Sequence, residues 1–151
     1  LYLGARAILV LALLAPLALP AGERAPAGAG DPPPLLEARA LVDRFYDLME
    51  LEPGYAGVRR LHPASLEGSR DKLHWFLCGW LGGPDLYMQR FGHPRLRARH
   101  LPFSIGVDER DQWLKCMSQA MEEEGVDAGL QRALAKAFFG TADWMRNRPE
   151  K

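Results

Sequence analysis

Residues 90–103 read Arg-Phe-Gly-His-Pro-Arg-Leu-Arg-Ala-Arg-His-Leu-Pro-Phe. This stretch combines two histidines and four arginines with apolar residues. Gly92, Pro94 and Pro102 leave room only for short helical turns between them. Longer segments with helical periodicity lie on both sides. We therefore expect an irregular, basic segment at the edge of a helical core, where a ligand-binding side chain can sit at the mouth of a pocket.

The two histidines of this segment, His93 and His100, are both candidate metal ligands. A neutral imidazole is a good axial ligand for haem iron. Arginine pairs well with carboxylates, and haem presents two propionates at its edge. Spacing alone does not separate His93 from His100. On these residues alone, a basic surface loop with a structural histidine is the more frequent explanation of the pattern.

Apolar residues recur at helical spacing in four longer segments: residues 35–51, 66–81, 108–124 and from 127 onward. Ser65 is predicted to cap the second of these helices and Asp108 the third. The sequence Gly82-Gly83-Pro84 is predicted to end the second helix. β-branched residues are scarce and no strand alternation is present, so the pattern predicts an all-α fold.

Length and charge restrict the organisation and function of the chain. Its 151 residues fit one domain with a sizeable core, and its 19 basic and 19 acidic residues argue against nucleic-acid binding. Two cysteines, Cys78 and Cys116, are too few for a disulfide scaffold and are expected to be buried thiols in helices.

The first 34 residues differ from the rest of the chain. Arg6 precedes an apolar run over residues 7–21 that is short for a membrane span, and residues 22–34 are rich in Ala, Gly and Pro. We expect a signal-like or disordered extension over residues 1–34 and a domain over 35–151. The expected location is the cytoplasm, or export or membrane anchoring if the apolar run is genuine.

Several runs of sequence resemble the group II truncated haemoglobins. They are residues 44–46, Trp80-Leu81-Gly82-Gly83-Pro84, residues 92–97 with 99–103, and Glu109-Arg110-Asp111-Gln112-Trp113-Leu114 with Cys116-Met117. The resemblance covers about residues 38–147. It implies a two-over-two helical sandwich around haem b (iron protoporphyrin IX). It also implies binding of oxygen and other small gaseous ligands, and a homodimer.

The same resemblance implies roles for individual residues. His100 corresponds to the proximal iron ligand, whereas His93 belongs to the turn before the proximal helix. Tyr46 and Trp113 correspond to distal residues whose hydroxyl and indole N–H point at the iron's ligand. His62 stands where most globins carry a phenylalanine or tyrosine against the haem. Its role is either distal hydrogen bonding or exposed solvation.

Other positions are implied to surround the cofactor. Leu73 corresponds to the apolar residue over the haem face, and Lys72 and Arg99 correspond to partners of the propionates. For these two cations the alternative is a solvated surface charge. The remaining residues expected to line the pocket are Phe76, Tyr87, Phe103, Ile105, Met117 and Trp144. The chain departs from the family near the first helix, where residues 31–37 lack the usual Gly-Gly.

The resemblance implies a functional class as well. Two distal donors hold oxygen tightly, because each hydrogen bond to a charged acceptor contributes about 1.5–3 kcal/mol. We therefore expect a haem protein with redox activity, or with detoxifying activity toward reactive oxygen or nitrogen species, supplied with electrons by an unidentified reductant. The alternatives are an oxygen carrier or sensor without turnover, and a cofactor-free helical interaction module.

Overall fold

The computed structural model describes residues 33–150, with side chains from Glu37 onward. Within this range the chain is helical. The elements are α2 (Pro33–Leu51), the short 3-10 helix η1 (Pro53–Tyr55), α3 (Ala56–Arg59), α4 (Glu67–Trp80), α5 (Leu86–Phe91), α6 (Leu96–His100), α7 (Val107–Glu123) and α8 (Ala128–Met145). The four predicted long helices are therefore confirmed, and their ends agree to within about two residues.

Helix α2 begins two residues earlier than predicted. Pro33 and Pro34, which the sequence places at the end of the N-terminal extension, form its first turn. Proline is tolerated there because the first N–H groups of a helix have no intrahelical acceptor. The apolar run over residues 7–21 lies outside the described residues. Among the described helices, none is long and apolar enough to cross a membrane.

Helix α4 ends where the glycines predicted it. Gly82 has a positive φ of 87°, and the N–H of Gly83 donates to the carbonyl of Cys78 at 2.8 Å. This is the usual way in which a glycine satisfies the last carbonyls of a helix. At the other end, Ser65 is not the capping residue. Leu66 occupies that position, while the Ser65 hydroxyl lies 3.4 Å from the N–H of Glu67.

The caps of α7 and α8 differ from each other. Asp108 does not cap α7, because the helix begins at Val107 and Gly106 occupies the cap. The Glu109 carboxylate accepts from the N–H of Gly106 at 2.9 Å. By contrast, the Asp127 carboxylate caps α8 and accepts from the N–H groups of Gly129 and Leu130. A carboxylate at this position satisfies N–H groups that the helix itself leaves free.

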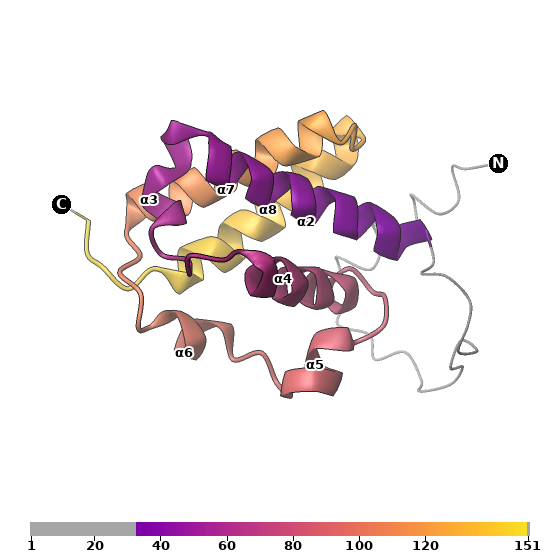
Figure 1. The fold of residues 1–151 in the computed structure, drawn as a ribbon, viewed down its shortest axis with the longest axis horizontal. Coiled ribbons are helices and arrows are strands. Elements are labelled where there is room, and N and C mark those ends of the chain that lie inside the picture. The colour runs from indigo at the N-terminus through magenta and orange to yellow at the C-terminus, as the bar shows by residue number, and fades with distance from the viewer. Residues whose placement is uncertain (1–32, 151) are drawn as a thin grey trace.

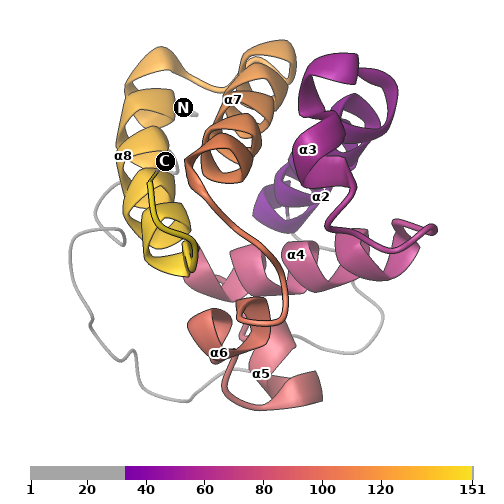
Figure 2. The same cartoon turned by 90° about the vertical axis from the view of Figure 1, so that its left-hand side faces the viewer.

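The long helices form one core. Helix α2 packs on α4 and α7, and α7 packs on α8. Figure 1 shows α4 running below this group, with α5 and α6 at the lower edge of the molecule. In Figure 2, α4 again lies between the upper helices and α5 and α6. The largest fully buried side chains are Phe45, Leu48, Met49, Leu77, Met117, Met121, Val42 and Cys116.

The arrangement separates two regions. The four long helices carry almost all of the core. The segment between α4 and α7 contains only two short helices, and α6 has no buried residue. The expectation for the cysteines is confirmed, since Cys78 and Cys116 are both buried in helices.

Candidate haem site

His100 is the last residue of α6 and is half-buried. Its Nδ1 lies 2.6 Å from the carbonyl oxygen of Leu96, one turn earlier in the same helix. Because a carbonyl only accepts, Nδ1 carries the proton and the lone pair is on Nε2. Metal-binding histidines are commonly oriented in this way by a backbone carbonyl. The imidazole of His100 therefore has the tautomer that an iron ligand requires.

His93 makes a different kind of hydrogen bond. It is exposed, and its Nδ1 accepts from the backbone N–H of Arg95 at 3.1 Å. The turn around it contains Gly92 with φ of 70° and Arg95 with φ of 44°. This bond stabilises the reversal of the chain before α6, which agrees with the turn role that the resemblance implied for His93.

The C-terminal tail holds the segment that follows His100. The side-chain amide of Asn147 donates to the carbonyls of His100 at 3.2 Å and Phe103 at 2.7 Å, and its oxygen accepts from the N–H of Ile105 at 3.0 Å. The backbone N–H of Asn147 also donates to Ile105. Asn147 was missed from the sequence, because a single asparagine beyond the last helix gives no signal of a partner more than 40 residues away.

Tyr46 lies on the opposite side of the site, on α2, and is 5% exposed. Its ring contacts Phe45 edge to face and lies 5.7 Å from the ring of His62. Burial raises the pKa of the Tyr46 hydroxyl above its usual range, although the positive charge of Arg70 opposes the shift. The hydroxyl therefore stays protonated at every physiological pH and remains a hydrogen-bond donor.

His62 follows α3 and is half-buried. Its Nδ1 lies 2.9 Å from the carbonyl oxygen of Val58, so Nδ1 donates and Nε2 carries the lone pair. Burial lowers the pKa of His62, and the charges of Arg59 and His100 lower it further, while the bond to Val58 raises it. His62 is thus a neutral acceptor rather than a cation.

Gln112 fixes the segment that leads to His62. Its side-chain oxygen accepts from the N–H of Val58 at 3.0 Å. A Cβ added at Gly57 would lie 2.6 Å from the end of the same side chain, so a larger residue there would displace the Gln112 amide. Gln112 precedes Trp113 in one of the runs that carries the family resemblance. The resemblance therefore included Gln112, but its hydrogen bond to Val58 of α3 was not predicted.

Trp113 lies on α7 beside the distal residues. Its ring centroid is 5.2 Å from that of Phe45 and 5.6 Å from that of Phe138. Met117, one turn later, is fully buried in the same cluster as Tyr46. The structure therefore brings Tyr46, Trp113 and Met117 together, with Leu73 of α4 packed against them.

Two more predicted pocket residues line one hollow. Phe76 of α4 and Tyr87 of α5 have ring centroids 6.3 Å apart and border a cavity of about 480 Å3 between these helices. The guanidinium of Arg99 lies 6.0 Å from the centroid of the Tyr87 ring, and Arg99 also donates to the carbonyl of Pro94 at 2.8 Å. The ammonium of Lys72 lies 5.8 Å from the centroid of the Phe91 ring. Neither cation is committed to a carboxylate among the described residues.

The last three predicted pocket residues lie toward the C-terminal tail. Ile105 is buried, and its carbonyl accepts from the backbone N–H groups of Asn147 and Arg148 in the tail. Phe103 is 41% exposed and Trp144 is 58% exposed, and neither belongs to the core cluster. Their contact with haem stays a prediction.

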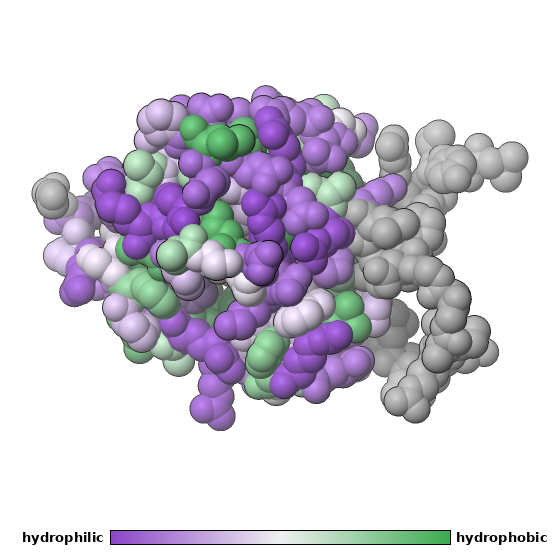
Figure 3. Space-filling model, viewed as in Figure 1, coloured by the Kyte–Doolittle hydropathy of each residue, from purple (hydrophilic) through white to green (hydrophobic). Residues whose placement is uncertain are grey.

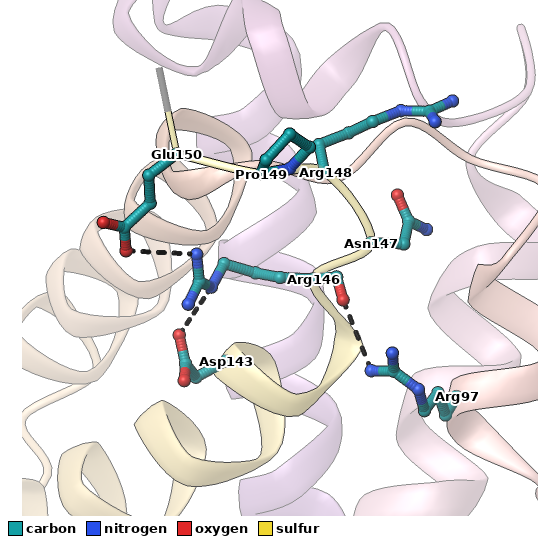
Figure 4. Close-up of a pocket in the computed structure, with 7 residues that line it drawn as sticks. All are labelled: Arg97, Asp143, Arg146, Asn147, Arg148, Pro149 and Glu150. Atoms are coloured by element: carbon teal, nitrogen blue, oxygen red, sulfur yellow. Dashed lines mark hydrogen bonds and ion pairs between the residues drawn. The ribbon is translucent and has the colours of Figure 1, made fainter.

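A polar cleft of about 630 Å3 beside the tail is a separate feature. Figure 4 shows Arg97 and Arg146 turned toward partners, whereas the side chain of Arg148 points away from the other residues drawn. Arg146 donates to Asp143 at 2.7 Å and contacts Glu150, and Arg97 donates to the carbonyl of Arg146 at 3.3 Å. The bond from Arg97 connects α6 with α8 across this cleft, and only Arg146 is paired with carboxylates there.

The residues present fit a haem. A metalloporphyrin with two carboxylates requires a nitrogen ligand for the metal, an apolar surface and cations. Here these are Nε2 of His100, the apolar cluster, and two cations that form no ion pair among the described residues. Tyr46, His62 and Trp113 add a polar group. His100 comes from the short-helix segment, whereas the polar group is carried by α2, the end of α3, and α7.

Comparison with known proteins gives a consistent result. A model of the bacterial-like globin family matches residues 36–147. Group 2 truncated hemoglobin YjbI of Bacillus subtilis is 39% identical over 110 residues, which are 73% of this chain and 81% of the relative. The structure of a group II 2-on-2 hemoglobin from Agrobacterium tumefaciens has a TM-score of 0.74 and 42% identity, over 76% of this chain and 89% of that one. A cold-adapted truncated hemoglobin from Pseudoalteromonas haloplanktis also has a TM-score of 0.74, with 39% identity over 76% of this chain and 93% of that one.

Proposed function

Since this chain belongs to the bacterial-like globin family, as a group II truncated haemoglobin, we propose that it acts on reactive oxygen or nitrogen species as a redox globin. As a globin it binds haem, and oxygen and other small gaseous ligands. The observation that carries the redox proposal is the polar group of Tyr46 and His62, whose ring centroids lie 5.7 Å apart, with Trp113 packed against the cluster that contains Tyr46.

His100 is the proposed ligand of the iron, in haem b. The bond from its Nδ1 to Leu96 supports this, because it orients the ring and leaves Nε2 available. Lys72 and Arg99 are the proposed partners of the two propionates. Bound haem supplies an iron with one open position for a small ligand.

The polar residues act on whatever ligand occupies the pocket. Tyr46 stays protonated because burial raises its pKa, so it donates a hydrogen bond, as does the indole N–H of Trp113. Neutral His62 accepts through Nε2, because its Nδ1 is bound to Val58. A pocket with two donors and one acceptor holds oxygen tightly and also positions the proton of a peroxide. This suits chemistry better than transport.

Oxygen dissociation tests the donors. We expect the double variant Tyr46→Phe/Trp113→Phe to release oxygen at least about 100-fold faster, since each of the two lost bonds to a charged acceptor is worth about 1.5–3 kcal/mol. Tyr55→Phe is the matched control, because Tyr55 is also buried but donates to Gln119 instead. Fast release in the unmodified protein, with no change in the double variant, contradicts the proposed donors.

A second measurement separates redox activity from carriage or sensing. The redox proposal expects the holoprotein to consume peroxide or nitric oxide repeatedly when a chemical reductant is supplied, and His62→Phe to slow the peroxide reaction. Oxygen binding without any turnover favours the carrier or sensor. The homodimer is a further proposal, and sedimentation of the holoprotein tests it.

A further inference from the structure

The segment over residues 86–103, which spans α5 and α6, has an unusual charge. It contains Arg90, Arg95, Arg97 and Arg99, and no aspartate or glutamate. The whole chain carries 19 basic and 19 acidic residues. The rest of the chain therefore has a net charge of −4, with fifteen basic residues facing nineteen acidic ones. One short segment thus concentrates the positive charge.

Arg90, Arg95 and Arg97 have charges that no carboxylate of the described residues compensates, whereas Arg99 is the proposed partner of a propionate. Arg90 donates to the carbonyl of Leu86 at 3.1 Å, and its guanidinium lies 4.3 Å from the centroid of the Trp75 ring. Arg97 and Arg99 also donate to backbone carbonyls. Within residues 33–150, none of the four is paired with a carboxylate. Because carbonyls orient guanidinium groups without cancelling their charge, a positive field extends from this edge.

Apolar side chains are exposed among these arginines. Those not predicted to line the haem pocket are Met88 (45% exposed), Phe91 (40%) and Leu101 (56%). Figure 3 shows hydrophobic and hydrophilic residues side by side along the lower edge, where Figure 1 places α5 and α6. Exposed apolar groups among charges are typical of a protein-binding surface, and a small inorganic anion would make no use of them.

Aromatic rings connect this surface with the candidate haem site. The ring centroid of Phe91 lies 5.9 Å from that of Trp75 and 5.0 Å from that of buried Tyr87. Tyr87 in turn contacts Phe76. Both Tyr87 and Phe76 are proposed to line the haem pocket. A partner seated over Phe91 would therefore lie one ring away from that pocket.

We propose that residues 86–103 form the docking surface for an acidic protein that carries single electrons. The proposal rests on the redox function proposed above, which requires a reductant. In the transfer, the reduced carrier loses one electron and the ferric globin gains it, so no bond and no proton has to move. Complementary charge would steer the encounter and make its rate depend on salt.

The test uses the holoprotein with reduced flavodoxin as an acidic one-electron donor. The variant Arg90→Gln/Arg95→Gln removes two charges from the surface and leaves His100, Lys72 and Arg99 in place. We expect the second-order rate of ferric reduction at low salt to fall about tenfold, at the lower end of the range for electrostatic steering. At about 1 M salt, where the Debye length is about 3 Å, the variant and the unmodified protein should react equally fast.

The matched control is Arg60→Gln/Arg132→Gln. These two exposed arginines lie outside the segment and form no ion pair in the described part of the chain, so the change in net charge is the same. We expect less than a twofold effect. Equal slowing by both double variants, or no dependence on salt, overturns the docking surface.

Binding supplies a readout that is independent of electron transfer. Titration of holoprotein into isotopically labelled oxidised flavodoxin should shift flavodoxin resonances, and the shifts should disappear with Arg90→Gln/Arg95→Gln. Binding to anionic lipid vesicles that is lost in the same variant, without binding to flavodoxin, overturns the proposal in favour of a membrane surface. If the unmodified holoprotein does not shift flavodoxin resonances but binds oxygen and turns over peroxide normally, this inference is refuted and the proposed function stays intact.

Discussion

The four long helices and the segment over residues 86–103 are stabilised in different ways. Between the long helices, apolar side chains are fully buried and ion pairs join neighbours, as with Arg39 and Asp71 at 2.8 Å or Arg110 and Asp143 at 2.5 Å. In the segment, Tyr87 is the one buried side chain, and the arginines bond to backbone carbonyls and rings instead of carboxylates.

This difference in stabilisation corresponds to a difference in the roles of the two regions. The long helices carry Tyr46 and Trp113, so the polar side of the site is part of the core. The segment carries His100 and the exposed cations, and the C-terminal tail holds its end through hydrogen bonds of Asn147. Stability and the proposed ligand chemistry therefore reside mainly in one region, and the proposed iron ligation and partner binding in the other.

The largest expected effect concerns the two histidines of the segment. We expect His100→Ala to abolish stable haem binding, because Nε2 of His100 is the proposed iron ligand. His93→Ala removes a turn contact only and should keep haem. The Soret absorption of the two purified variants measures this difference. A normal spectrum for His100→Ala would refute the assignment, and loss of haem in both variants would show that the turn itself is essential.

Two leucines test the contrast in stability. Leu48 on α2 is 2% exposed, whereas Leu101 in the segment is 56% exposed. We expect Leu48→Ala to lower the free energy of unfolding by about 2–5 kcal/mol and Leu101→Ala by less than about 0.5 kcal/mol. Denaturant unfolding followed by circular dichroism measures both. Similar costs would mean that the segment has a core of its own.

The sequence predicted the long helices well because their signals are local. Apolar spacing identified α2, and Gly82 with its neighbours identified the end of α4. Resemblance to a family separated His93 from His100, which spacing could not. Their different hydrogen bonds are consistent with that separation.

The rest depended on partners that are distant along the chain. Asn147 binds the carbonyl of His100 across 47 residues, and Gln112 binds Val58 across 54. A polar residue next to a helix end looks the same in a sequence whether it faces solvent or a backbone carbonyl. The predictions that Ser65 and Asp108 cap their helices were wrong for a local reason. Several residues near a helix start can act as the cap, and the backbone geometry decides among them.

Asn147 connects the two regions, and we expect its substitution to have an effect of intermediate size. Asn147→Ala removes three hydrogen bonds between the tail and the end of the segment. We expect a loss of about 1–3 kcal/mol and faster transfer of haem to apomyoglobin, because carbonyls near His100 lose their partners. Arg148→Ala is the control, since Arg148 is exposed and its side chain contacts Ser104. If haem leaves both variants equally fast, the tail does not position His100.

The smallest effect concerns the ion pairs of the framework and their dependence on pH. Hydrogen bonds from Arg110 and Arg146 lower the pKa of Asp143 below its usual value. An acid with a lowered pKa in the folded state contributes stability above its unfolded pKa, and that contribution is lost as pH falls through the folded value. We therefore expect Asp143→Asn to lower the Tm at pH 7 and to converge with the unmodified protein in strong acid. Glu122→Gln, which removes an exposed carboxylate without an ion pair in the described part of the chain, should behave like the unmodified protein at both extremes. A difference in Tm between Asp143→Asn and the unmodified protein that stays constant with pH would show that the side chain acts by packing. The contrast between the ion-paired helices and the carbonyl-bonded segment would then not extend to stability.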